Sequence, residues 1–117
     1  MDGSSLPIVV AHGEGRASFA MTQNVTAQDF VRHNLAPVRY VDNVTLKPTM
    51  TYPYNPNGSP EGIAGIRSPD GRVLAIMPHP ERTVLGGVAS WLPADAEKWG
   101  DVGPWGRIFY SARRWVG

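Results

Sequence analysis

Two short runs of consecutive apolar residues stand out in the hydrophobic pattern of the chain, Leu6–Ala11 and Val73–Met77. Such runs, rich in branched side chains, are typical of strands buried on both faces, although a buried helix segment gives the same pattern. Each run leads into a loop that contains a histidine. Sites in open α/β sheets form at the carboxyl ends of strands, so parallel neighbouring strands would bring both loops to one pocket.

The middle of the chain alternates between strand candidates and turn residues. Ile63–Arg67 and Arg72–Met77 flank Ser68–Gly71, whose Pro, Asp and Gly favour a tight turn, so a β-hairpin is predicted. Val38–Val41 is a further strand candidate. Tyr52–Gly62 contains three prolines and two glycines, which exclude regular structure. Within it, Asn55–Gly62 is either a pocket mouth or interface, or a surface turn held by Asn and Ser side chains.

Two helices are expected. Thr26 can cap a helix and Asp29 stands three residues later, as in a capping box, so a helix is predicted from there to about Asn34. Gly103–Trp105 opens a C-terminal helix whose apolar residues recur at the i, i+3, i+4, i+7 spacing of one buried face. That face comprises Trp105, Ile108, Phe109, Ala112, Trp115 and Val116. The arginines of the helix fall outside this face and suit solvent and the helix C-terminus.

Composition and charge narrow the class of protein. A chain of 117 residues suits one small domain or part of a larger one, and 42% hydrophobic with 18% charged residues indicates a globular chain. The net charge is +1 without a run of like charges, so no nucleic-acid partner is expected. No apolar stretch approaches the ~20 residues of a membrane span, and no secretory signal is recognised. The absence of cysteine excludes disulfides and a cysteine nucleophile from within this chain.

The segment His79-Pro80-Glu81 is the first candidate for chemistry. Pro80 disfavours the helical region for His79, and in an extended segment His79 and Glu81 point to the same side. A histidine oriented by a carboxylate is the base half of a nucleophile–base–orienter site. The alternative is a loop histidine that happens to precede Pro-Glu, since short motifs often match by chance.

The second candidate is the loop His12-Gly13-Glu14, followed by Gly15 and Arg16. Its glycines would let the backbone approach a substrate, so the loop either contacts a ligand or is a Gly-rich turn between strands. A third interpretation pools the two His and two Glu of both loops as a metal site, without a helical H-E-x-x-H spacing to support it. No G-x-S-x-G or G-x-C-x-G elbow exists, so the chain holds a base and its orienter without a nucleophile.

Five blocks of residues, in this order and spacing, resemble the C-terminal part of the phosphoribosylformylglycinamidine synthases, also called formylglycinamide ribonucleotide amidotransferases, in their large single-chain form. The blocks are Leu6–Arg16, Arg39–Asn43, Tyr52–Ser59, Met77–Arg82 and Gly103–Phe109. The resemblance covers essentially the whole chain. It implies a class I (triad) glutamine amidotransferase domain of flavodoxin-like α/β fold, of which residues 1–117 are the second half, without the nucleophile-bearing half.

The resemblance also implies a reaction and the residues that serve it. In that family a cysteine attacks the carboxamide of glutamine, and the released ammonia is used in de novo purine synthesis. His79 and Glu81 match the family's catalytic His and Glu, and His12, Gly13 and Glu14 match a segment that lines the glutamine pocket. No cofactor is expected in this chain, because ATP and magnesium belong to the family's synthetase domains. A cytoplasmic location is also implied.

Two hypotheses of different class follow. In the first, the chain is the base-bearing portion of a glutaminase domain, with His79 as general base and acid and Glu81 as its orienter, and is inactive alone. Its partners are then glutamine, the remaining amidotransferase half and the synthetase domains. In the second, the chain is a non-catalytic binding module, and its uncovered sheet edge and apolar face lead to self-association.

Overall fold

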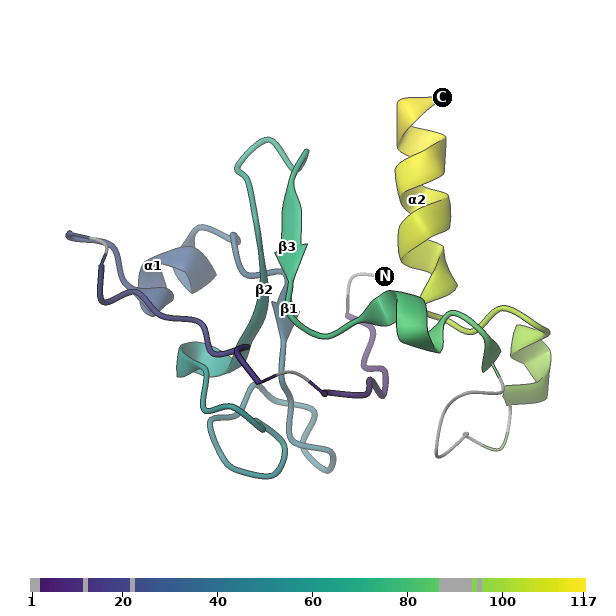
Figure 1. The fold of residues 1–117 in the computed structure, drawn as a ribbon, viewed down its shortest axis with the longest axis horizontal. Helices are drawn as coiled ribbons and strands as arrows, with labels where there is room; N and C mark the ends of the chain where they lie inside the picture. The colour runs from purple at the N-terminus through teal and green to yellow at the C-terminus, as the bar shows by residue number, and fades with distance from the viewer. Residues whose placement is uncertain (1–2, 12, 22, 87–93, 95) are drawn as a thin grey trace. The chain divides into compact units, whose positions relative to one another are not determined.

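The structure, a computed structural model, describes residues 3–11, 13–21, 23–86, 94 and 96–117. The chain forms two compact units, one of His12–Pro78 and one that combines Met1–Ala11 with His79–Gly117. The elements of the first unit are α1 (Ala27–Arg32), β1 (Val38–Arg39), the 3-10 turn η1 (Pro60–Gly62), β2 (Ile63–Arg67) and β3 (Leu74–Ile76). Those of the second are the 3-10 turns η2 (Pro80–Thr83) and η4 (Ala96–Trp99) and the helix α2 (Gly106–Val116) (Figure 1).

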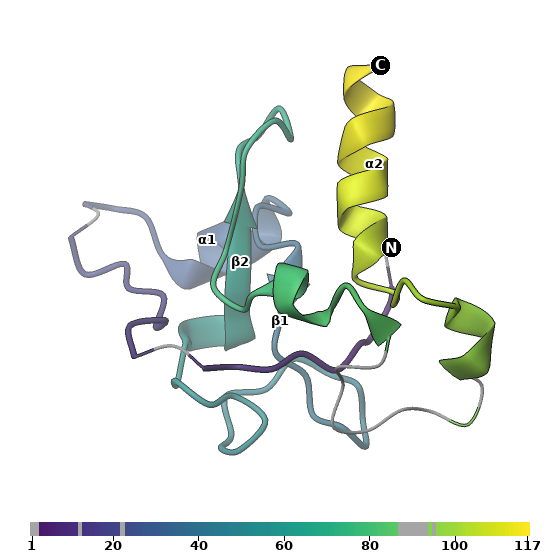
Figure 2. The ribbon, with the colours of Figure 1, turned by 45° about the vertical axis from the view of Figure 1, so that its right-hand side comes forward.

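The sheet of the first unit has the strand order β1-β2-β3, and both pairings are antiparallel. The predicted hairpin is confirmed: Gly65 pairs with Ile76, and both views of the ribbon show β2 and β3 side by side (Figures 1 and 2). Its turn is closed by side chains, because Ser68 Oγ donates to Asp70 at 2.6 Å and accepts from the Val73 amide at 3.0 Å. The α/β class, with a hairpin and a C-terminal helix, is therefore confirmed.

The prediction that both apolar runs form buried strands is wrong. Leu6–Ala11 forms no strand, and its side chains alternate between exposed and half-buried. The run instead fixes Trp105, whose indole Nε1 donates to the carbonyl of Pro7 at 2.7 Å. The second run does contain β3, but Val73 and Leu74 are 62% and 43% exposed. A short apolar run indicates that a strand could be buried, but it does not specify what would cover it.

The N-terminal cap of α1 forms as predicted. The Thr26 hydroxyl accepts from the Asp29 amide, and the Asp29 carboxylate accepts from the Thr26 amide at 2.9 Å, which completes a capping box. The side-chain hydrogen bond from Thr26 is the main reason that the pKa of Asp29 is lowered. The helix ends earlier than predicted, because Asn34 takes a left-handed φ of 56°. Phe30 packs against Phe19, with ring centroids 5.1 Å apart.

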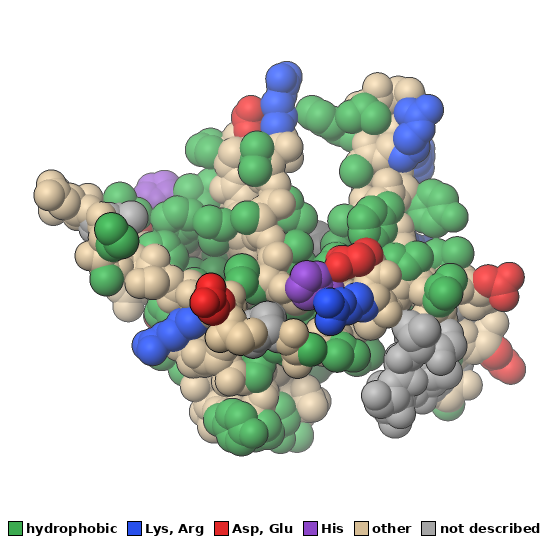
Figure 3. Space-filling model, viewed as in Figure 1, with side chains coloured by type: hydrophobic (Ala, Val, Ile, Leu, Met, Phe, Trp, Pro, Cys, Tyr) green, Lys and Arg blue, Asp and Glu red, His purple; other side chains and the backbone are tan. Residues whose placement is uncertain are grey.

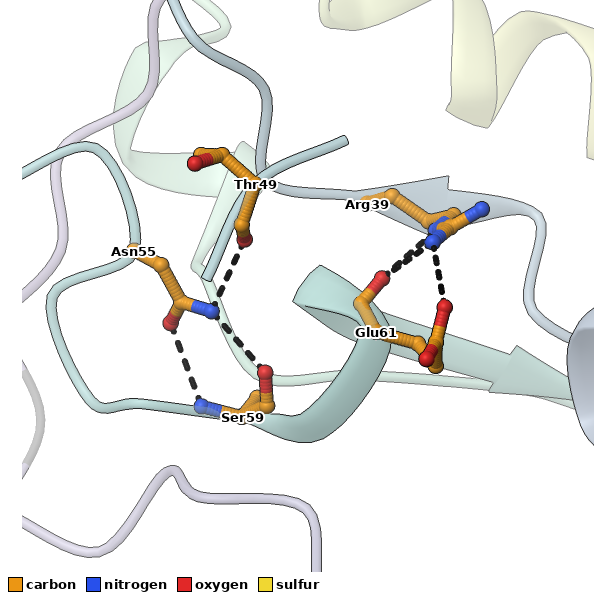
Figure 4. Close-up of polar contacts among 5 residues, drawn as sticks. All are labelled: Arg39, Thr49, Asn55, Ser59 and Glu61. Atoms are coloured by element: carbon orange, nitrogen blue, oxygen red, sulfur yellow. Dashed lines mark hydrogen bonds and ion pairs between the residues drawn. The ribbon is translucent and has the colours of Figure 1, made fainter. Parts of the chain in front are cut away.

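Two polar side chains are buried in the long loop before β2. Asn55 is 1% exposed and Ser59 is 0% exposed. The Asn55 amide group donates to the carbonyls of Thr49 at 3.1 Å and Ser59 at 2.9 Å, and its oxygen accepts from the Ser59 amide (Figure 4). Asn and Ser side chains thus hold this loop, as one alternative predicted, but they do so from inside the unit and not from its surface.

The loop reaches β2 through two successive left-handed residues, Glu61 at φ 55° and Gly62 at φ 69°. Arg39 on β1 stabilises this bend: its Nε donates to the Glu61 carbonyl at 2.7 Å, and its Nη2 lies 3.4 Å from the Glu61 carboxylate (Figure 4). A Cβ added to Gly62 would lie 2.9 Å from the carbonyl oxygen of Tyr40 and 3.0 Å from that of Thr49. The position therefore requires glycine for both conformation and space.

The C-terminal helix α2 forms as predicted, with Arg113 and Arg114 in its last turn. Its apolar face is buried only at the start. Trp105, which precedes the helix, is 8% exposed, whereas Phe109, Trp115 and Val116 are 46%, 66% and 68% exposed. Hydrophobic side chains are accordingly visible on the surface along this helix (Figure 3). The 3.6-residue period predicts which face a helix can bury, but not whether a covering element is present.

Candidate active site

The backbone that presents His79 changes direction at a proline-rich corner. The Met77 amide donates to the carbonyl of Ala64 at 3.0 Å, which extends the β2–β3 pairing by one residue. Pro78 is fully buried, and His79 follows in an extended conformation with φ −100° and ψ 90°. Pro80 then occupies the first position of η2, where a missing amide proton costs nothing.

The turn η2 is anchored by its buried residues and presents the others. Pro80 and Thr83 are buried, and the Thr83 hydroxyl donates to the Pro80 carbonyl at 3.1 Å. The Arg82 amide donates to the His79 carbonyl at 3.1 Å, which closes the turn. The side chains of His79 and Glu81 are 41% and 56% exposed. A rigid turn therefore carries a polar pair that solvent and other molecules can reach.

His79 and Glu81 form the predicted pair, with 2.7 Å between Nδ1 and the carboxylate oxygen Oε1. The conformation behind the pair differs from the prediction. The two side chains meet because Pro80 and Glu81 enter a 3-10 turn, and not because the segment stays extended. The backbone amide of Glu81 is the main cause that lowers the pKa of its carboxyl group from 4.5, and the hydrogen bond from His79 adds to it.

This geometry fixes which ring nitrogen of His79 is basic. The lowered pKa of Glu81 keeps its carboxylate ionised at neutral pH, and an ionised carboxylate can only accept hydrogen bonds. In the neutral imidazole, Nδ1 therefore carries the proton, and Nε2 has a lone pair that can accept one. The arrangement can perform general base and acid chemistry on a group brought to Nε2. The sequence contains no cysteine to supply a thiol.

The predicted substrate-binding residues belong to the other compact unit. Gly13 and Glu14 lie there in exposed loop positions, and His12 lies outside the described residues. Their assignment as substrate-binding residues therefore stays a prediction. Within the part of the chain that the structure describes, no three His, Asp or Glu side chains gather into a metal-binding cluster. Because His12 is outside that part, the pooled metal site stays a hypothesis.

Sequence reasoning did not identify the cavity beside Arg16. The structure places an open cavity of about 700 Å³ in the His12–Pro78 unit, and Arg16 is among the residues that line it. The feature of the sequence that could have pointed to this cavity is the arginine that follows Gly15 at the end of the glycine-rich loop. The pattern did not show that residues 42 positions later, in the Asn55–Gly62 loop, bond to this segment.

The lowered pKa of Glu81 gives a test of the pair. We expect its carboxyl group to titrate below 4.5 in an NMR pH titration. A depressed carboxyl pKa contributes stability that is present above the unfolded-state pKa and is lost as the pH falls through the folded-state value. Glu81→Gln should therefore flatten the acid side of the stability–pH curve. In His79→Ala the pKa should rise only part of the way to 4.5, because the backbone hydrogen bond remains, and a complete return would contradict this account.

The α/β fold and the paired His and Glu are consistent with a glutamine amidotransferase domain, and comparison with known families agrees. Residues 1–116 match the family described as CobB/CobQ-like glutamine amidotransferase domain, and the chain belongs to this family. It is 54% identical over 118 aligned positions to phosphoribosylformylglycinamidine synthase of Saccharomyces cerevisiae, and 53% identical to that of Schizosaccharomyces pombe. Both alignments cover 100% of this chain.

The chain is short relative to these two relatives. It spans 8% of the length of the Saccharomyces cerevisiae protein and 9% of the Schizosaccharomyces pombe protein. In the described residues, no helix has both the length and the apolar character that crossing a bilayer requires. The comparisons therefore show the family of this chain. The reaction of the much longer relatives is proposed for it separately.

Proposed function

We propose that this chain supplies the base-bearing part of a glutaminase site that releases ammonia from glutamine for formylglycinamidine ribonucleotide synthesis in purine biosynthesis. The observation that supports this most directly is the 2.7 Å pair of His79 and Glu81 in a member of a glutamine amidotransferase family. The cysteine nucleophile would come from a polypeptide segment that is not in this sequence. Glutamine and that segment are the proposed partners.

In the proposed reaction, Nε2 of His79 takes the proton from the thiol of that cysteine. The thiolate then attacks the carboxamide carbon of glutamine, and the imidazolium returns the proton to the nitrogen that leaves as ammonia. Water hydrolyses the resulting thioester to glutamate, with His79 again as base. Glu81 holds the ring and stabilises its cationic form through the Nδ1 proton. No cofactor takes part in these steps, and ATP and magnesium are assigned to the synthetase domains of the family.

Reconstitution tests this proposal. The purified chain is combined with the nucleophile-bearing portion of the Saccharomyces cerevisiae relative, and ammonia release from glutamine is measured. We expect release from the mixture and none from either part alone, and none when the cysteine of the added portion is replaced by alanine. Ammonia release by the isolated chain, abolished by His79→Ala, would contradict the division of the site. Failure of two folded, associated parts to release ammonia would contradict the proposed function.

A binding module is the second candidate. Among the described residues β3 pairs only with β2, and the exposed apolar residues of α2 add to the surface available to a partner. Exposed edges and apolar faces are sites of association. Sedimentation that shows a strictly monomeric chain would count against self-association through these features.

A further inference from the structure

The loop before β2 contains the dipeptide Asn57-Gly58, in which a backbone amide directly follows a side-chain carboxamide. The amide nitrogen of the glycine can attack Cγ of the asparagine and close a five-membered ring. Glycine has no Cβ to shield that nitrogen. Gly58 is exposed, and a Cβ built on it would meet nothing within 4 Å. Among the hydrogen bonds of the described residues, none engages the Gly58 amide. The nitrogen that would attack is therefore open to solvent.

The carboxamide of Asn57, in contrast, is held at both ends. Its Nδ2 donates to the carbonyl of Gly15, and its Oδ1 accepts from the amide of Ser59 at 3.1 Å and from the Ser59 hydroxyl at 2.8 Å. Ring closure requires the carboxamide to turn its face to the Gly58 nitrogen and its Cγ to become tetrahedral. Both changes move Nδ2 and Oδ1 away from these three partners, so the folded loop opposes the reaction.

The partners of this carboxamide cannot follow such a movement. Ser59 is 0% exposed, and its backbone amide and carbonyl are both bonded to the side chain of Asn55 (Figure 4). The Ser59 hydroxyl also accepts from the amide of Ala17 at 3.0 Å. The carboxamide of Asn57 is therefore released only when this loop opens as a unit. Local openings of this kind occur in folded proteins at a lower free energy than global unfolding.

We propose that Asn57 is a site of self-deamidation, which the folded loop suppresses and which opening of the loop permits. The Gly58 amide loses its proton to hydroxide, and its nitrogen forms a bond to Cγ of Asn57. The bond from Cγ to Nδ2 breaks, and Nδ2 takes protons from water and leaves as ammonia. Water then opens the cyclic imide at either carbonyl, which gives aspartate or isoaspartate. No oxidant, reductant or cofactor is needed, and the reaction does not depend on the proposed function.

Either product prevents the loop from returning to its original state. A carboxylate at this position has no proton to donate to the carbonyl of Gly15. Isoaspartate in addition routes the backbone through the side chain and inserts a methylene group before Ser59, whose two bonds to Asn55 require a fixed position. A transient opening is thus converted into a lasting change in the His12–Pro78 unit.

Mass spectrometry of the digested chain tests the site. The chain is incubated at mildly alkaline pH in buffer or in guanidinium chloride, and conversion of each asparagine to the acid is followed over time. We expect Asn57 to convert about tenfold or more slowly in the folded chain than in denaturant. Asn55 is the internal control, because Pro56 has no amide proton to lose. Equal rates in the two solvents would overturn the suppression, and no conversion of Asn57 in denaturant, or equal conversion of Asn55, would overturn the site.

Two variants separate the chemistry from the fold. In denaturant, where folding plays no part, Gly58→Ala should slow the conversion of Asn57 because its methyl group shields the attacking nitrogen. In buffer, Ser59→Ala should accelerate conversion, since it removes the hydroxyl that donates to Asn57. Ser68→Ala is the matched control, because it removes a bonded hydroxyl from the hairpin turn of the same unit. An unchanged rate in Gly58→Ala would contradict attack by this amide, and equal acceleration by both serine variants would overturn control by the loop.

The lasting effect of deamidation has a readout of its own. Asn57→Asp reproduces one product, and it keeps an oxygen that accepts from Ser59 but removes the donor to the Gly15 carbonyl. We expect faster hydrogen exchange at the Ala17 amide, which bonds to Ser59 in the same loop. The Val73 amide, which bonds to Ser68 in the hairpin turn, should keep its protection. Unchanged exchange at Ala17 would contradict the claim that the product holds the loop open.

Discussion

Replacing His79 with alanine is expected to lower ammonia release by the reconstituted site about 10²- to 10⁴-fold, the usual contribution of a positioned acid–base group. The thiol would lose its proton acceptor and the leaving nitrogen its proton donor. The measurement is kcat/KM for glutamine. Arg82→Ala is the matched control, because Arg82 is an exposed residue of the same turn and does not form the His79–Glu81 bond. An equal loss in both variants would indicate damage to the turn and would contradict a specific role of His79.

The double variant that combines His79→Ala with Glu81→Gln tests whether the two residues act as one unit. In the proposed mechanism Glu81 acts on the reaction through the ring that it orients, so Glu81→Gln should lower kcat/KM less than His79→Ala. Once His79 is absent, replacing Glu81 should have little additional effect on kcat/KM. Residues that act as one unit show such non-additivity. Losses that multiply in the double variant would contradict the assignment of Glu81 as the orienter of His79.

Gly62→Ala is expected to lower the free energy of unfolding by about 2–5 kcal/mol. An L-residue at a left-handed φ costs about 1–2 kcal/mol, and overpacking adds about 1–3 kcal/mol. Both apply here, because Gly62 has a φ of 69° and an added Cβ would lie 2.9 Å from the carbonyl oxygen of Tyr40. That neighbour is a backbone atom of the unit's core and cannot rotate away. Urea denaturation measures the difference.

Gly58→Ala separates the two causes. Gly58 has a similar φ of 68°, but a Cβ added there meets nothing within 4 Å. We expect this variant to lose only the conformational part, about 1–2 kcal/mol. The difference between the two variants then measures the steric part. Equal losses would show that the close approach of Tyr40 and Thr49 to Gly62 does not contribute.

The features that the sequence predicted correctly depend on local chemistry. The hairpin follows from Pro69, Asp70 and Gly71 between two strand candidates, and the start of α1 follows from Thr26 and Asp29. In each case the residues that determine the structure lie within a few positions of each other. The His79–Glu81 pair was predicted for the same reason, although the conformation that brings the two together is a 3-10 turn.

The features that the sequence did not predict depend on partners distant in the chain. Leu6–Ala11 has the composition of a buried strand, but the carbonyl of Pro7 accepts a hydrogen bond from the indole of Trp105 instead of pairing with a strand. The stripe on α2 has the correct period, yet most of it is exposed. Asn55 and Ser59 look like polar loop residues in the sequence and are among the most buried side chains in the structure. Burial depends on tertiary contacts, and neither hydrophobic periodicity nor turn chemistry specifies those contacts.

The short span of the His79–Glu81 pair has a consequence for how such a site is assembled. Only one residue separates the two, and a single anchored turn sets their geometry. If the proposed function holds, the base and its orienter would be ordered when this turn forms, before any nucleophile arrives, and little conformational entropy would remain to be lost at the encounter. In the proposed site, the encounter would then have to place only one sulfur atom, because the other portion of the site is preorganised locally by this turn.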